Sequence, residues 1–132
     1  EIFCLTNVIK FEVYSSSFKE PNQFGRNILR YASSLSQLIV EGTKIGPLNV
    51  DFGRFQRLTV LHLIAAGLQH APVIRRSLLF LESVDFSWND LSEIPASWSS
   101  SLRSVKYFVI SHNPRLTSLE PINGFPEIVE LR

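Results

Sequence analysis

The chain has 132 residues, and its 13 lysines and arginines nearly balance 12 acidic residues, which leaves a formal net charge of +1. A chain of this length is expected to form one domain with a sizeable core. Its composition, 45% hydrophobic and 19% charged, excludes a disordered chain. General capture of nucleic acid needs a stronger positive field than this charge provides, so we predict no nucleic-acid partner.

Several kinds of site are excluded by residue counts. Cys4 is the only cysteine, so the chain has no internal disulfide and no thiolate metal site. His62, His70 and His112 lack the paired spacing of a zinc site, and we predict no metal or cofactor. No apolar run approaches the roughly 18 residues of a membrane span. We therefore predict no direct membrane insertion of this segment, which leaves open a tether through a longer parent chain.

A recurring apolar pattern organises the chain from about residue 8 onward. It is clearest in "LESVDFSWNDLSEIP", residues 81–95, where apolar residues follow one another at steps of three, two, five and three. The second apolar position of each copy recurs at Phe11, Leu38, Leu61, Val84, Phe108 and Leu131. The steps are 27, 23, 23, 24 and 23 residues. Such a period exceeds a single helix or strand and indicates a stacked supersecondary unit.

In chain order, this period divides a single domain over residues 1–132 into six units. A degenerate copy at about 8–34 is followed by copies at 35–57, 58–80, 81–104 and 105–127 and by a partial copy at 128–132. In "SVDFS", residues 83–87, Val84 and Phe86 alternate with polar residues, which is the signature of a half-buried β-strand. We expect one such strand in each unit. A second apolar row is expected in the returning segments, at Tyr31, Phe55, Leu78, Trp98 and Phe125.

The pattern L-x-x-L-x-L-x-x-N-x-L resembles the leucine-rich repeat family, over roughly residues 8–132. The resemblance implies an α/β solenoid, a horseshoe with a parallel β-sheet on its concave face and short helical or irregular convex segments. It also implies that Asn89 and Asn113 are buried turn amides that bond neighbouring backbone turns. Ser16 and Thr43 could do this in part, whereas Ala66 cannot. Neither end of the chain has a polar cap, so we expect a fragment of a longer solenoid.

Residues one period apart would form rows across the exposed concave face. His62, Asp85 and Val109 share the central row. The predicted partner-binding surface comprises His62, Ile64, Asp85, Trp88, Tyr107, Val109 and His112. Aromatic side chains among polar groups are typical of interface hot spots. The alternatives are that another part of a parent chain covers these aromatic residues, or that Trp88 lies at a different depth.

Two weaker signals have a functional and a structural interpretation. His62 beside Asp85, with Ser87 nearby, resembles an acid–base pair with a hydroxyl nucleophile. We favour an ordinary cross-strand polar pair and predict no enzyme, because an open face has no enclosed pocket. Seven arginines recur before the strands, at positions 26, 30, 54, 57, 75, 76 and 103. They could meet phosphate or glycosaminoglycan, but we favour a solvated face.

The favoured function is a non-catalytic protein-binding module. The stretch "LSEIPASW", residues 91–98, resembles the longer, extracellular animal-type repeats. This resemblance implies a receptor ectodomain or an adhesion or matrix protein, extracellular or at the cell surface. The alternative is a cytoplasmic leucine-rich repeat scaffold or regulatory subunit that docks a partner enzyme. Repeat length favours the first setting, whereas the single cysteine and the lack of Asn-x-Ser/Thr sequons favour the second.

Overall fold

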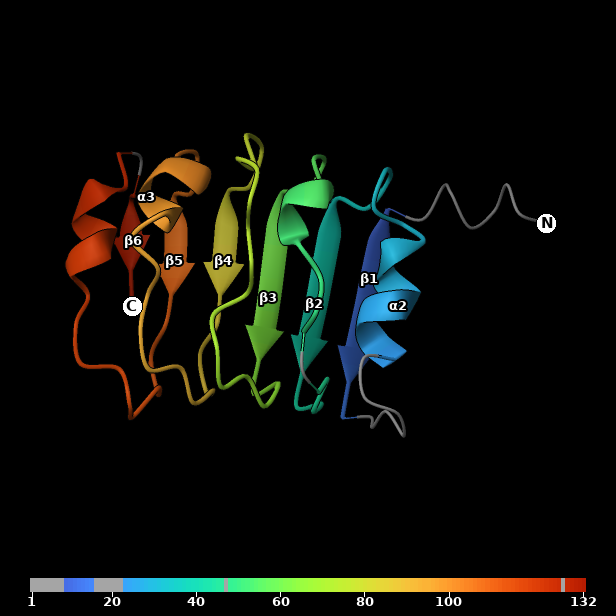
Figure 1. The fold of residues 1–132 in the computed structure, drawn as a ribbon, viewed down its shortest axis with the longest axis horizontal. Coiled ribbons are helices and arrows are strands. Elements are labelled where there is room, and N and C mark those ends of the chain that lie inside the picture. The colour runs from blue at the N-terminus through green and yellow to red at the C-terminus, as the bar shows by residue number, and fades with distance from the viewer. Residues whose placement is uncertain (1–8, 16–22, 47, 127) are drawn as a thin grey trace.

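A single six-stranded parallel sheet organises the chain, and its strands lie side by side in chain order from β1 to β6 (Figure 1). The computed structural model describes residues 9–15, 23–46, 48–126 and 128–132. The strands are β1 (Lys10–Tyr14), β2 (Gln37–Glu41), β3 (Val60–Ile64), β4 (Ser83–Asp85), β5 (Tyr107–Val109) and β6 (Glu130–Leu131). The predictions made for Cys4 and Ser16 lie outside the described residues.

The register of the sheet confirms the predicted period. Leu38 pairs with Leu61, Leu61 with Val84, and Val84 with Phe108, so residues one period apart are direct neighbours. All five strand pairs are parallel. The α/β class and the parallel sheet are therefore as predicted, while the horseshoe curvature stays a prediction.

Short helical segments lie between the strands. They are α2 (Gln23–Leu29), the 3-10 helix η1 (Phe52–Arg54), α3 (Trp98–Ser101) and the 3-10 helix η2 (Glu120–Gly124). The carboxylate of Asp51 accepts the N–H of Gly53 at 2.9 Å, which satisfies a free backbone donor at the start of η1. In Figure 1, η1 and α3 lie at the level where β3 and β5 begin. Within the described part of the chain, no helix has the length and apolar character needed to cross a membrane.

One apolar layer joins the sheet to the returning segments. In β2, Leu38 and Val40 are fully buried, whereas Gln37 and Glu41 are not, which is the alternation of a sheet with one covered face. The ring of Phe86 lies 5.5 Å from that of Trp98, which comes from α3. Burying an aromatic side chain of this kind stabilises the fold by about 1.5–3 kcal/mol.

The returning segments contribute the second apolar row expected from the sequence. Phe55, Leu78 and Trp98 are at most 1% exposed, and Phe125 is 7% exposed. Tyr31 is partly buried against the same core. The exposed face of the sheet and the turns at both ends of the strands thus lie outside this layer and can carry a binding site.

Candidate binding surface at the strand ends

Each of the first five strands is followed by a residue in the left-handed backbone conformation. These residues are Ser15, Gly42, Ala65, Trp88 and His112, with φ values of 48°, 66°, 50°, 60° and 57°. They lie one period apart, so they form a row along the edge where the strands end. For a non-glycine residue this conformation costs about 1–2 kcal/mol, and it persists only where the surroundings hold it in place.

Asn89 bonds the turn after β4 to the turn after β3. Its Oδ1 accepts the backbone N–H groups of Ala66 at 3.0 Å and Leu68 at 3.1 Å. Its Nδ2 donates to the carbonyl oxygens of Leu63, Phe86 and Ser87 at 2.7, 2.9 and 3.2 Å. The amide is buried, so these bonds satisfy turn groups that water does not reach.

Asn113 makes four bonds that correspond to four of these five, one unit later. Its Oδ1 accepts the N–H of Leu91 at 3.0 Å. Its Nδ2 donates to the carbonyl oxygens of Phe86, Ile110 and Ser111 at 3.0, 2.9 and 3.3 Å. Two successive amides therefore fix the backbone on both sides of Trp88.

Trp88 and His112 form a stacked aromatic pair at this edge. Their ring centroids are 3.8 Å apart and the ring planes differ by 5°. Trp88 is nevertheless 60% exposed. Along the row, the residues before Trp88 are Ala65 and Gly42, which are small. His112 therefore covers one face of the indole, and on the other side of Trp88 the row continues with small residues.

Hollows lie on both sides of Trp88. A cavity of about 520 Å³ is lined by Trp88, Asn89, His112, Asn113 and Pro114. A second cavity, of about 430 Å³, is lined by Lys44, Gly46, Gly67, Gln69, Trp88, Asn89 and Asp90. Asp90 also accepts an ion-pair contact from Arg115 at 3.3 Å. Trp88 thus lines both hollows, together with polar residues.

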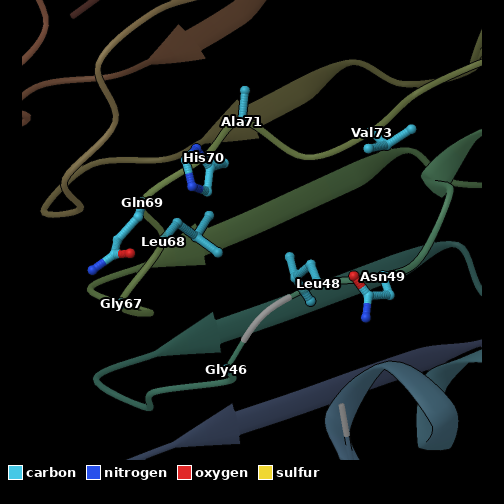
Figure 2. A pocket seen from close by; sticks show the side chains of 9 residues that line it. All are labelled: Gly46, Leu48, Asn49, Gly67, Leu68, Gln69, His70, Ala71 and Val73. Atoms are coloured by element: carbon cyan, nitrogen blue, oxygen red, sulfur yellow. The ribbon is translucent and has the colours of Figure 1, made fainter. Parts of the chain in front are cut away.

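A third hollow continues from the second one. Figure 2 shows that its lining comes from two neighbouring units, with Gly46, Leu48 and Asn49 from one and residues 67–71 and Val73 from the next. It holds about 520 Å³ and shares Gly46, Gly67 and Gln69 with the second cavity. Gly46 and Gly67 have φ values of 75° and 73°, so a side chain at either position would be strained. The three hollows give the strand-end edge a row of recesses that a protruding partner could fill.

His62, Asp85 and Ser87 fall into two separate hydrogen-bonded pairs. His62 Nε2 lies 2.9 Å from Ser83 Oγ. Asp85 Oδ1 accepts the hydroxyl of Ser87 at 2.6 Å and its N–H at 2.9 Å. Burial lowers the pKa of His62, against the opposite influence of Asp85 and Glu41. The structure therefore does not join His62, Asp85 and Ser87 in one acid–base–hydroxyl chain.

The seven residues predicted for the partner-binding surface fall into two groups. His62, Asp85 and Val109 share one row of the sheet face. Ile64 and Tyr107 also belong to strands, and Tyr107 is 41% exposed. Trp88 and His112 instead lie beyond the strands, in the turns. The edge residues Lys44, Gln69, Asp90 and Arg115 were not predicted. The glycines at 46 and 67 were the sequence signal that could have located these turns, because glycine favours positive φ.

Comparison of the chain with protein-family models finds no match, and comparison with curated proteins finds none either. Among the residues that the structure describes, no group of three or more His, Cys, Asp or Glu side chains is placed to hold a metal ion. The function is therefore argued from the geometry of the strand-end edge.

Proposed function

We propose that this chain is a non-catalytic protein-binding module of the leucine-rich repeat type. In this proposal the units stack into a solenoid, a horseshoe whose concave face is the exposed face of the sheet. Two observations support it: strands pair at a spacing of 23 or 24 residues from β2 onward, and Asn89 and Asn113 bond successive turns. A rigid scaffold of this kind presents side chains without requiring any chemistry.

The exposed indole of Trp88 carries the proposal for a binding role. It is stacked on His112 and held in a left-handed backbone conformation, while 60% of its surface remains exposed. A large aromatic side chain that is exposed, and whose backbone conformation is costly, is expected to serve recognition. The partner is a protein that inserts a side chain into the hollows beside Trp88, with Tyr107 and His62 on the sheet face as further contacts.

Two settings for this module follow from the sequence. The first is a receptor ectodomain or an adhesion or matrix protein at the cell surface. The second is an intracellular scaffold or regulatory subunit that docks a partner enzyme. The same contact surface serves either setting, so the origin of the captured partner decides between them.

The test is affinity capture with the immobilised domain from separate cell-surface and cytosolic fractions. A Trp88→Ala/His112→Ala variant removes the stacked pair. Val129→Ala is the matched control. Val129 is 72% exposed, but it lies just before β6, whereas Trp88 and His112 lie in turns that follow strands. Circular dichroism and urea unfolding first establish that all three proteins are folded.

We expect a specific protein to be retained by the wild type and by Val129→Ala and to be lost with the double variant. Isothermal titration with that purified protein should then give a Kd at least about tenfold weaker for the double variant, as for the loss of a hot spot. Equal affinity for wild type and double variant would overturn the proposed surface.

A further inference from the structure

A second exposed apolar feature lies at the other end of the strands. The N–H of Leu81 bonds the carbonyl oxygen of Leu78 at 3.3 Å and closes a turn just before β4. Leu78 and Leu81 are buried and anchor this turn in the core. The two central residues, Leu79 and Phe80, are 65% and 67% exposed.

The neighbouring units contain the same turn with polar centres. The N–H of Leu58 bonds the carbonyl oxygen of Phe55 at 3.0 Å, around Gln56 and Arg57. One unit after Leu79–Phe80, the N–H of Val105 bonds the carbonyl oxygen of Leu102 at 3.2 Å, around Arg103 and Ser104. Polar centres are what such turns favour. The fold therefore does not require the apolar pair at Leu79 and Phe80.

Hydrogen bonds place the three turns side by side. Gln56 Nε2 donates to the carbonyl oxygen of Ser77 at 3.2 Å. The N–H of Leu78 bonds the carbonyl oxygen of Ser101 at 2.9 Å, and Ser104 Oγ donates to that of Leu78 at 3.2 Å. In Figure 1, the segment before β4 rises above the ends where the strands begin. The apolar pair therefore lies at a convex tip, between Arg57 on one side and Arg103 on the other.

Exposed arginines occur in the segment that carries this tip and in the segments on either side of it. The exposed arginines of the three neighbouring segments are Arg54, Arg57, Arg75, Arg76 and Arg103. None of them makes a side-chain hydrogen bond or ion pair with any residue that the structure describes.

The acidic groups close to these arginines already have partners. The carboxylate of Asp51 accepts the backbone N–H groups of Gly53 and Arg75, both at 2.9 Å. Glu82 forms an ion pair with Lys106 at 3.7 Å. The guanidinium groups around the tip are thus available to an external anion.

We propose that the Leu79–Phe80 turn, with its flanking arginines, is a peripheral docking site for an anionic lipid bilayer. Phosphate and carboxylate headgroups match guanidinium groups, while two adjacent apolar side chains can enter the boundary between headgroups and acyl chains. A bilayer receives a convex tip without a shaped recess. The three hollows at the strand-end edge do not involve the turn, so a partner protein would have to supply a complementary recess itself.

This proposal departs from two expectations drawn from the sequence. The lack of a spanning helix concerns membrane crossing, whereas a turn can contact the interface without one. The net charge of +1 is a sum over the whole chain, while the five arginines lie in three consecutive segments, the middle one of which carries the tip. Anionic headgroups are typical of the cytoplasmic leaflet, which fits the intracellular setting of the protein-binding module. The docking site itself does not depend on that module.

The test is co-sedimentation of the full chain with large vesicles of phosphatidylcholine, alone or mixed with phosphatidylserine. Leu79→Gln/Phe80→Ser gives the turn polar centres like those of its neighbours. Arg57→Gln/Arg103→Gln removes the adjacent cations. Val129→Ser is the control for an exposed apolar side chain elsewhere, and urea unfolding compares the stabilities of all variants.

The wild type and Val129→Ser should bind the phosphatidylserine vesicles at low salt and not the neutral ones. Each double variant should lower the partition coefficient about tenfold, and the arginine variant should also weaken the salt dependence. Failure of the wild type to bind, or unchanged binding of Leu79→Gln/Phe80→Ser, would overturn the proposal. Binding to soluble polyglutamate without binding to vesicles would also overturn it and would identify a contact for an acidic protein.

Discussion

The turns after β2 and β3 differ from those after β4 and β5 in the residue at the turn-amide position, which is Thr43 or Ala66 in the first two and Asn89 or Asn113 in the last two. After β2, the N–H of Ile45 bonds the backbone carbonyl oxygen of Ala66 at 3.2 Å. At the equivalent positions after β3 and β4, the N–H groups of Leu68 and Leu91 bond the side-chain amides of the following unit at 3.1 and 3.0 Å. The same backbone donor is thus satisfied by a main-chain acceptor after β2, where the following turn has Ala66, and by an asparagine of the following turn after β3 and β4.

The two regions also differ in the side chain at the left-handed position. The turns after β2 and β3 have Gly42 and Ala65 there, whereas those after β4 and β5 have Trp88 and His112. The large residues occur in the turns that contain the amides of Asn89 and Asn113. We infer that the amides hold these turns firmly enough to display an aromatic pair in a costly conformation.

The largest expected effect comes from removing the amide that joins the two regions. Asn89→Ala should lower the free energy of unfolding by about 3 kcal/mol or more, because it leaves buried N–H and C=O groups without partners. Urea unfolding monitored by circular dichroism measures this loss. Asn123→Ala, at an exposed asparagine, is the control and should change stability by less than about 0.5 kcal/mol. Similar losses for the two variants would show that the turn amides do not hold the fold.

A smaller effect is expected at the left-handed position of the other region. Gly42→Ala should destabilise the protein by about 1 kcal/mol, because Gly42 has a φ of 66°. The added Cβ would meet Ser15 Oγ at 3.5 Å, an ordinary contact, so strain and not crowding causes the loss. Gly42→Asn is the matched comparison, since asparagine tolerates this conformation better. If alanine were tolerated as well as asparagine, the left-handed row would carry no strain.

The smallest effect concerns the sheet face beside both regions. Burial lowers the pKa of His62, so the unfolded chain binds a proton more readily than the folded one as the pH falls through about 6.5. Stability should therefore decrease from pH 7.5 towards acidic pH more steeply in the wild type than in His62→Gln. Urea unfolding at several pH values measures both slopes. A steeper slope in the variant would contradict the burial of a neutral imidazole.

Much of the fold could be predicted from the apolar period alone. A repeat of 23 or 24 residues predicts that Leu38, Leu61 and Val84 are neighbours, because stacked units of equal length align equivalent positions. The alternation around Val84 predicts the covered face of the sheet. The strand-end turns were less predictable. In β4 the pairing ends at Asp85, and the chain turns at Trp88 into a conformation that sequence patterns do not favour for tryptophan.

The site was predictable only in part for the same reason. Trp88 and His112 share a row because the period places them there, but their stacking depends on both backbones adopting positive φ. The separate pairs of His62 with Ser83 and Asp85 with Ser87 depend on side-chain rotamers, which spacing does not determine. The exposure of Leu79 and Phe80 could not be predicted from the sequence, because they lie between the buried residues Leu78 and Leu81 in one continuous apolar run.

The most direct test of the central claim, that Trp88 is displayed for binding and not for stability, is the unfolding free energy of Trp88→Gly. Glycine relieves a left-handed cost of about 1–2 kcal/mol. The same change gives up a stacking contact of about 0.5–1.5 kcal/mol and about 0.5–1 kcal/mol of backbone entropy. We therefore predict a change between a gain of about 1 kcal/mol and a loss of about 1.5 kcal/mol. A loss of more than about 2 kcal/mol, of the size seen when core residues are truncated, would show that Trp88 is a structural residue and contradict the account.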